Sequence, residues 1–260
     1  MLKKILLTLL LVSSLFAMDA RLNQNVHAKN LYQMATQENN ADAAFDLGIF
    51  YSETLKDYKE AIVWYEKAYK MGTSGAAYNL GYLYKNDLKN YKKAEEWYLK
   101  AIEQNDIKTP RALGLLYKNH FEDYPKAIKW YKKAYEIGDM GGANGLGYLY
   151  DVTLKNTEEG IKWYKKAAQG GHADAINNLN KTYANQGNPL LSAAYIIALI
   201  AYGDSKEEVF NYLKDGRKLN NEEIKQAYQL QKTLDIPKHY YDAELEDNPT
   251  SKSKNPRGQR

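Results

Sequence analysis

The chain has 260 residues, of which 44% are hydrophobic, so it can bury a sizeable core. Its net charge is +4 and falls to +2 once the two lysines of the first 17 residues are set aside, which gives no electrostatic case for nucleic-acid binding. The absence of cysteine excludes disulfides, thiolate metal sites and cysteine catalysis.

Residues 1–17, MLKKILLTLLLVSSLFA, have the pattern of a secretory signal peptide, in which two lysines precede the apolar run Ile5–Phe16. That run is shorter than the roughly 20 residues of a membrane-spanning helix. We expect cleavage after Ala17; a cut after Ala20 and an uncleaved leader are the alternatives. No cysteine follows that could carry a lipid anchor. The sequence therefore predicts a periplasmic or secreted protein.

Residues 18–40 contain half of a unit that recurs later in the chain. Four residues match, at a distance of 33 positions, the apolar face of a helix in the first full copy: Ala28, Leu31, Tyr32 and Ala35 correspond to Ala61, Trp64, Tyr65 and Ala68. Terminal repeats are typically atypical because one of their faces has no neighbour. We therefore expect an N-terminal capping helix.

Residues 41–203 carry the recurring unit itself, with a period of 33 residues. A Leu-Gly pair, and 17 residues after its leucine a Trp-Tyr pair, appear four times in register: Leu47-Gly48, Leu80-Gly81, Leu113-Gly114 and Leu146-Gly147, with Trp64-Tyr65, Trp97-Tyr98, Trp130-Tyr131 and Trp163-Tyr164. A fixed period of 20–50 residues indicates a stacked repeat architecture. The copies span about 41–73, 74–106, 107–139 and 140–172, and a divergent fifth follows.

Each copy is predicted to form two helices. Both have apolar residues at i, i+3, i+4 and i+7, which is the pattern of one helical face: Ala44, Leu47, Gly48 and Tyr51, then Ala61, Trp64, Tyr65 and Ala68. An aspartate or asparagine precedes each second helix and is expected to cap it: Asp57, Asn90, Asp123 and Asn156. Glycine inside a helix costs about 1 kcal/mol relative to alanine, so its recurrence predicts a close helix approach. The alanines of the second helix are the expected contact.

The end of the chain departs from this unit. In the fifth copy Asn180 replaces the glycine, and the helix expected at Leu190–Tyr202 is apolar nearly all round, which favours burial under residues 204–236. Asn220 with Glu223 has the spacing of a capping box at a helix start. Residues 237–260 are polar and are predicted to form a disordered tail.

The run KAIKWYKKAYEIG at Lys126–Gly138, repeated with variations at Lys59–Gly72, resembles the Sel-one-like repeat family, a relative of the tetratricopeptide repeats. The resemblance covers about residues 41–236. This chain differs in having a shorter loop between the helices, without the family's Gly-x-Gly-Val sequence. The resemblance implies an all-α, right-handed α/α superhelix of about five helix pairs with terminal caps, in which ligands bind along a concave face lined by the first helices.

No residue pattern indicates catalysis or a cofactor, and none is predicted. The four histidines lack paired metal-ligand spacing: His27, His120, His172 and His239. Some cysteine-rich secreted relatives in this family are described as binding or hydrolysing β-lactams, and Ser251–Lys254 does spell S-x-x-K. That motif falls in the predicted tail, without the partner motifs of such enzymes and without a fixed base for a nucleophile.

The candidate site is therefore a surface. Carrying over the groove positions of the related superhelices selects first-helix residues that differ from copy to copy: Tyr78, Asn79, Tyr82, Lys85, Arg111, Lys118, Asn144, Tyr148, Asn177 and Lys181. Such variation is expected of a partner-specific groove, and equally of positions that the fold leaves free to drift. Asparagine can pair with a backbone amide and arginine with a carboxylate, which suits an extended peptide that carries an acidic group.

The sequence thus predicts a non-catalytic scaffold that binds a protein or peptide partner outside the cytoplasm. Two alternatives stay open: a β-lactam-active or other cell-wall enzyme, and a structural adaptor in an envelope complex.

Export gives the first testable prediction. If residues 1–17 are a cleaved signal peptide, the mature chain begins at Met18. Intact-mass analysis of protein recovered from the periplasm or the culture medium should give the mass of residues 18–260. A full-length chain confined to the cytosol would contradict the prediction.

Overall fold

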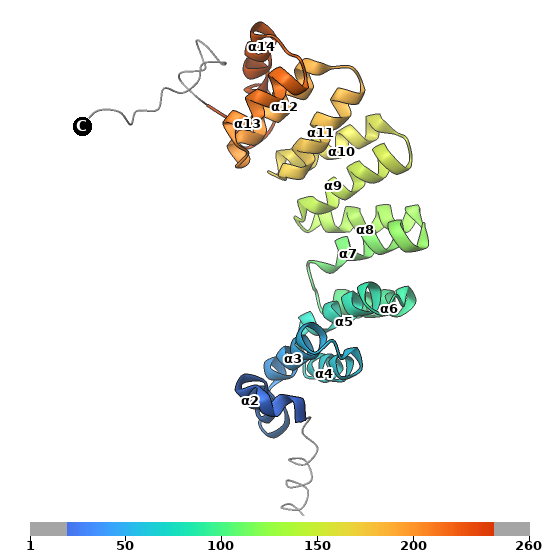
Figure 1. The fold of residues 1–260 in the computed structure, drawn as a ribbon. Coiled ribbons are helices and arrows are strands. Elements are labelled where there is room, and N and C mark those ends of the chain that lie inside the picture. Colours follow the sequence, from blue (N-terminus) through green and yellow to red (C-terminus); the bar gives the residue numbers. More distant parts are fainter. Residues whose placement is uncertain (1–19, 242–260) are drawn as a thin grey trace, which may run out of the picture. The chain divides into compact units, whose positions relative to one another are not determined.

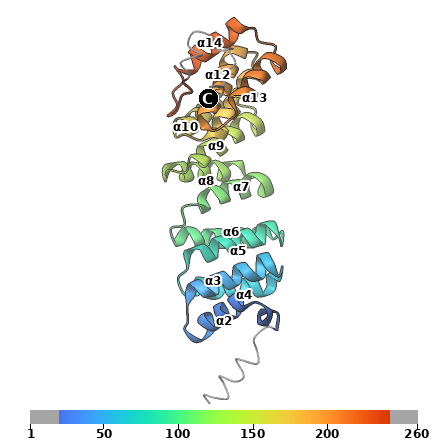
Figure 2. The ribbon, with the colours of Figure 1, turned by 60° about the vertical axis from the view of Figure 1, so that its left-hand side comes forward.

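The structure, a computed structural model, describes residues 20–241. The predicted signal peptide, most of the predicted tail and the Ser251–Lys254 motif lie outside the described residues. The chain divides into two compact units between Thr109 and Pro110. The described residues form helices only, as the sequence predicts, and consecutive helices within each unit pack side by side (Figures 1 and 2).

The first unit contains the N-terminal cap and two repeats. A 3-10 turn, Ala20–Gln24, precedes the capping helix. The α-helices are α2 (Val26–Gln37), α3 (Ala41–Ile49), α4 (Tyr58–Lys70), α5 (Ser74–Asn86) and α6 (Tyr91–Glu103). Leu22 and Ala28 of the cap are fully buried, so the half-repeat does cover the first complete copy.

The second unit contains three repeats and the C-terminal cap. Its α-helices are α7 (Thr109–Leu116), α8 (Tyr124–Glu136), α9 (Met140–Tyr148), α10 (Thr157–Gln169), α11 (Ala173–Asn185), α12 (Pro189–Leu199), α13 (Lys206–Asn211) and α14 (Asn221–Gln231). Helices α3, α5, α7, α9 and α11 are the first helices of the five copies, and α4, α6, α8, α10 and α12 are the second helices.

The loops between paired helices are built by capping residues and left-handed backbone. The predicted caps accept hydrogen bonds from the amide three residues later: Asp57 from Glu60, Asn90 from Lys93, Asp123 from Lys126 and Asn156 from Glu159. The residue before each cap has a positive φ although none is glycine: Lys56, Lys89, Glu122 and Lys155, at 52–58°. The short loop without glycines therefore closes through left-handed conformations of long polar residues, at a strain of about 1–2 kcal/mol each.

The recurring glycine contacts the tyrosine of the Trp-Tyr pair in its own copy. A Cβ atom added at any of the four glycines would collide with that ring: Gly48 with Tyr65, Gly81 with Tyr98, Gly114 with Tyr131 and Gly147 with Tyr164. The expectation that alanines of the second helix are this contact is wrong for these positions, because the tyrosine ring lies flat against the glycine. Alanine instead faces the next copy, where Gly142 lies against Ala134.

The recurring tryptophan is held by aromatic and cationic neighbours. The lysine three residues later lies over each indole ring, with Nζ–centroid distances of 5.1 Å for Lys67, 3.9 Å for Lys100, 5.3 Å for Lys133 and 4.0 Å for Lys166. Trp97 also packs edge-on against Tyr69, and Trp163 against Tyr135. These cation–π contacts explain why a lysine occupies this position in each of the four copies that have the tryptophan.

The junction between the two units differs from the other connections. Asp106 Oδ1 accepts hydrogen bonds from the amides of Lys108 and Thr109 and from the Thr109 hydroxyl. Pro110 has no amide hydrogen, and α7 begins late and spans only Thr109–Leu116. The boundary between the two compact units therefore falls inside the predicted repeat segment 41–203, at the start of α7.

The apolar helix of the fifth copy is covered as predicted. Ile197 of α12 shares a buried cluster with Phe210 of α13 and with Ile224 and Tyr228 of α14. The capping box forms, because Asn220 accepts from the Glu223 amide while the Glu223 carboxylate accepts from the Asn220 amide. Residues 204–236 therefore form the C-terminal cap.

The described start of the predicted tail is anchored to this cap. The backbone of Tyr240 makes two hydrogen bonds with the side-chain amide of Gln231, which is fully buried. His239 Nε2 lies 2.8 Å from the Leu234 carbonyl oxygen. His239 and Tyr240, at the start of the predicted tail, are therefore held against the cap.

The glycine–tyrosine contact gives a stability prediction. Gly81→Ala adds a methyl group that collides with the Tyr98 ring, and overpacking of this kind typically lowers the free energy of unfolding by about 1–3 kcal/mol. Gly75→Ala, in the same helix, is the matched control, because its Cβ would come no closer than 3.4 Å to Phe45. The control should be neutral or stabilising, by up to about 1 kcal/mol. Chemical denaturation measures both, and equal effects would contradict the proposed contact.

Candidate functional site

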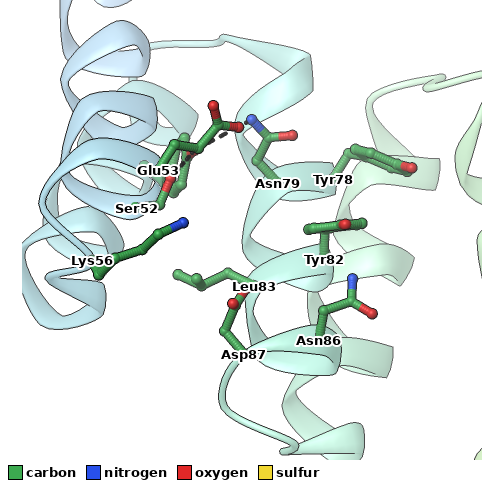
Figure 3. Close-up of a pocket in the computed structure, with 10 residues that line it drawn as sticks. Ser52, Glu53, Lys56, Tyr78, Asn79, Tyr82, Leu83, Asn86 and Asp87 are labelled. Atoms are coloured by element: carbon green, nitrogen blue, oxygen red, sulfur yellow. Dashed lines mark hydrogen bonds between the residues drawn. The ribbon is translucent and has the colours of Figure 1, made fainter.

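The first unit has an open cavity of about 640 Å³ beside α5. Its lining residues come from the segment between α3 and α4, from α4 and from α5 with the residue that follows it (Figure 3): Ser52, Glu53, Lys56, Tyr65, Tyr78, Asn79, Tyr82, Leu83, Asn86 and Asp87. Asn79, Tyr82 and Asn86 have the spacing i, i+3 and i+7, so they share one helical face. Ser52 and Lys56 line it from the π-helical turn Phe50–Thr54 and the loop that follows.

Hydrogen bonds fix one side of this cavity. The Tyr65 hydroxyl lies 3.1 Å from Ser52 Oγ, and Asn79 Nδ2 donates to the same hydroxyl at 3.5 Å. Figure 3 shows the Asn79 carbonyl oxygen directed away from that bond. Asn86 Nδ2 is buried and has no hydrogen-bond partner among the described residues. The wall therefore offers an amide oxygen and an amide NH₂ group, between which the exposed ring of Tyr82 lies.

Lys85 lies beside the cavity and is not among its lining residues. Its Nζ is 5.7 Å from the centre of the Tyr82 ring. Burial, reinforced by the charge of Lys89, lowers the pKa of Lys85 below its ordinary value. Of the predicted residues on α5, Tyr78, Asn79 and Tyr82 thus line one cavity, and Lys85 supports the Tyr82 ring.

The second unit has a smaller cavity of about 220 Å³ beside α9. Four predicted residues line it, together with residues that the sequence did not single out: Arg111, Lys118, Asn144 and Tyr148, with Leu115, Tyr131, Gly141, Gly145, His172 and Asp174. Gly145 keeps the site open, because a Cβ at this position would meet the Tyr131 ring. The Tyr131 ring is therefore contacted by glycines of two first helices, Gly114 of its own copy and Gly145 of the next.

Two cationic side chains, Arg111 and Lys118, line this second cavity together with the carboxylate of Asp174. Arg111 Nε pairs with Asp139 Oδ2 at 2.8 Å, which ties its guanidinium to the loop before α9. Lys118 Nζ lies 4.4 Å from the centre of the Tyr148 ring, and burial lowers the pKa of Lys118. Within residues 20–241, Lys118 makes no ion pair, so it is a partly buried cation that an incoming carboxylate could neutralise.

The last two predicted residues, Asn177 and Lys181, line a third cavity of about 660 Å³ at the C-terminal cap. Nine of the ten predicted residues thus lie at cavities, each cavity within one unit. The sequence also predicts that residues of α5 and α7 line the same concave face. This stays a prediction. Sequence reasoning missed Asn86 and His172; Asn86 could have been found seven residues after Asn79 on the same helical face.

The described residues show no sign of metal or membrane chemistry. No group of three or more potential metal ligands occurs within residues 20–241, and His172 lies at the start of α11 with its Nδ1 buried. No helix in the same range is long and apolar enough to cross a membrane.

Four consecutive stretches of the chain match the Sel1 repeat: residues 41–73, 74–106, 113–139 and 142–172. The stacked helix pairs agree with this match, and the chain belongs to the Sel1 repeat family, which is related to the tetratricopeptide repeats. The repeats match where Leu-Gly and Trp-Tyr recur in register, whereas the fifth copy, with Asn180 in place of glycine, lies outside the matched residues.

Two solved structures illustrate the fold. A protective antigen of uropathogenic Escherichia coli that displays an SLR fold aligns with a TM-score of 0.59 and 24% identity, over 80% of this chain and 48% of that chain. This chain thus spans about half of the antigen. A Sel1 repeat protein from Oxalobacter formigenes aligns with a TM-score of 0.54 and 25% identity, over 81% and 95% of the two chains. No curated protein sequence matches the chain.

The buried tyrosine beneath the first cavity gives a pH prediction. Tyr98 packs against Tyr78 at 5.7 Å, and its hydroxyl has no hydrogen-bond partner among the described residues. Burial raises the pKa of Tyr98 above its ordinary value of 10.0. The folded state therefore binds the proton more tightly than the unfolded state, so stability should be complete below about pH 10 and fall as the pH rises above it.

Tyr98→Phe should remove part of this alkaline sensitivity. The buried hydroxyl is lost together with its titration, so the free energy of unfolding at pH 7 should stay equal or rise. Thermal unfolding between pH 7 and pH 11 measures both effects. Tyr91→Phe, at a half-buried tyrosine in the first turn of α6, is the control. A steeper alkaline loss in Tyr98→Phe than in the unaltered chain would contradict the assignment.

Proposed function

We propose that this protein is a non-catalytic interaction scaffold that binds an extended peptide segment of a protein partner through the first helices of its repeats. The observation that supports this proposal most strongly is that positions outside the repetitive core supply most of each cavity wall. Leu80 and Gly81 of α5 are buried in the core, whereas Asn79 and Tyr82, their immediate neighbours, line the cavity.

The chemistry of the first cavity favours peptide backbone as its ligand. An extended peptide presents carbonyl and amide groups in alternation, and Asn79 and Asn86 offer an acceptor and a donor on one helical face. The exposed Tyr82 ring between them supplies apolar contact area with little side-chain entropy to lose. A cavity of about 640 Å³ falls within the usual range of roughly 300–1,000 Å³ for ligand sites.

The charge of the second cavity favours an acidic group in the ligand. Lys118 is partly buried without a carboxylate partner in the described residues, and Arg111 is already positioned by Asp139. A carboxylate placed between them would make charge-assisted hydrogen bonds, which are stronger than neutral ones. This cavity is therefore the proposed acid-selective part of the surface, and the cavity beside α5 the backbone-binding part.

The proposed place of action is the periplasm or the extracellular space, on the basis of residues 1–17. The competing function is a β-lactam-active enzyme, for which the S-x-x-K spelling is the single sequence feature. The test is whether the mature chain hydrolyses nitrocefin and still does so after residues 242–260 are deleted. Such turnover would favour a catalytic protein and would contradict the scaffold proposal.

Selection from a library of random, displayed ten-residue peptides tests the proposal with the mature chain. We expect enriched sequences that share an acidic residue. Asn79→Ala combined with Asn86→Ala should weaken the selected peptides by at least about tenfold, because each lost hydrogen bond is worth about 1 kcal/mol. The melting temperature should change little, since both side chains lie outside the apolar stripe of α5.

Charge variants resolve the acidic preference. Lys118→Gln should abolish the preference for acidic peptides, whereas Lys132→Gln, which removes an exposed lysine from the second helix of the same copy, should leave it intact. Lys92→Ala with Lys132→Ala is the control for the asparagine pair. The proposal fails if no sequence is enriched, or if the control variants lose binding while the groove variants keep it.

A further inference from the structure

We propose that the third cavity, bounded by α11, α12 and α13, binds a carboxylate carried next to an apolar group, as found at the C-terminus of a polypeptide. Its volume is about 660 Å³. This inference rests on Asn180, Arg217 and the apolar wall of the third cavity. None of these residues lines the cavity beside α5 or the cavity beside α9. The proposal therefore does not depend on peptide binding along α5 and α9.

The cavity arises where the fifth copy breaks the glycine–tyrosine rule. The period of 33 places Asn180 where the other copies have glycine, and Ile197 where they have tyrosine. The smaller isoleucine leaves room for a polar side chain at a position that is otherwise filled by a ring. Asn180 is 7% exposed, and its Oδ1 accepts a 2.7 Å hydrogen bond from Ser192, which is 1% exposed. A buried polar network thus lies at the base of the cavity.

This network holds the guanidinium group of Arg217. Arg217 Nη2 donates to Asn180 Oδ1 at 3.4 Å, and the guanidinium lies 5.4 Å from the centre of the Tyr212 ring. Arg217 Nε is buried and has no hydrogen-bond partner, and Arg217 makes no ion pair with any described residue. A half-buried arginine is therefore oriented by a neutral amide and an aromatic ring while donors remain unused.

The unused donors of Arg217 match a carboxylate. The guanidinium group presents parallel N–H bonds in a fork that complements the two oxygens of a carboxylate. An anion that reaches the guanidinium group from the cavity would add a charge-assisted hydrogen bond, which is stronger than a neutral one. Lys181 lines the same cavity and supplies a second cation.

The rest of the wall selects what the carboxylate is attached to. Ile196, Leu199 and Val209 line the cavity beside the Tyr212 ring. An apolar side chain next to the carboxylate can pack against them, as leucine would at the end of a polypeptide. Asp204 and Glu208 also line the cavity. Their negative charges disfavour a second acidic group, so a ligand with one carboxylate is preferred over one that ends in glutamate.

The first test compares ligands on the unaltered mature chain by isothermal titration calorimetry. The probe is the tripeptide acetyl-Ala-Ala-Leu with a free C-terminal carboxylate, and the matched control is its C-terminal amide. We expect the acid to bind roughly 10- to 100-fold more tightly, which corresponds to a hydrogen-bonded charge. Equal affinities for the acid and the amide, or no binding of the acid, would overturn the proposal. Because the test uses the unaltered chain, its result does not depend on whether a variant folds.

Two further ligands define the chemistry. Acetyl-Ala-Ala-Glu should bind more weakly than the leucine peptide, because its side chain adds negative charge beside Asp204 and Glu208. Free 4-methylpentanoate distinguishes the sources of the carboxylate: binding as tight as that of the tripeptide identifies a small carboxylic acid, and weaker binding identifies a polypeptide end. A tighter glutamate peptide would contradict the assigned wall.

The second test assigns the site to Arg217. Arg217→Gln should remove the advantage of the acid over the amide, whereas Lys218→Gln, which removes the same charge from the exposed neighbouring residue, should keep it. Neither variant alters Asn79, Asn86 or Lys118, so binding of the library-selected peptides should be unchanged in both. If Lys218→Gln loses the preference and Arg217→Gln retains it, the carboxylate binds elsewhere.

Discussion

The contact between a helix glycine and a tyrosine ring sets the geometry of every matched repeat. Because the ring of Tyr98 lies flat on Gly81, the two helices of a copy approach more closely than a Cβ atom would allow. The same tyrosine is almost fully buried in each copy, so the second helix is fixed in rotation as well as in distance. The flanking residues Asn79 and Tyr82 are consequently held away from the core, and this is what makes them available to a ligand.

The fifth copy shows what happens when this contact is removed. Asn180 and Ile197 replace the glycine and the tyrosine, so no tyrosine ring packs at this position. The side-chain amide of Asn180 is buried there and requires hydrogen bonds. Ser192 and Arg217 provide them. Arg217 comes from the loop before α14, so the capping helices supply a polar group as well as the apolar cover of α12.

The repeat, the caps and the core were predictable from the sequence because each depends on local periodicity. The Asp and Asn caps and the covered helix Leu190–Tyr202 follow from residue type and spacing, and the family follows from the resemblance of runs such as Lys126–Gly138 to its repeat. The tyrosine that contacts the glycine could not be predicted in this way. A period of 33 shows that both residues recur, but it does not show which residues contact each other. The sequence also did not predict two further features, the division between Thr109 and Pro110 and the network around Arg217. Both depend on contacts of residues that do not recur between copies.

Because the core residues recur from copy to copy, the type of side chain can vary only at positions that do not pack in the core. The position five residues after each conserved leucine holds Ser52, Lys85, Lys118, Asp151 and Ala184 in successive copies. Ser52 bonds to the Tyr65 hydroxyl, Lys118 lies over Tyr148, and Asp151 accepts from the Thr182 hydroxyl. One structural position thus presents a hydroxyl, cations, an anion or a methyl group, from a π-helical turn at Ser52, Lys118 and Asp151 and from an α-helix at Lys85 and Ala184. Each repeat therefore separates the residues that hold its two helices together from the residues that are free to vary between copies.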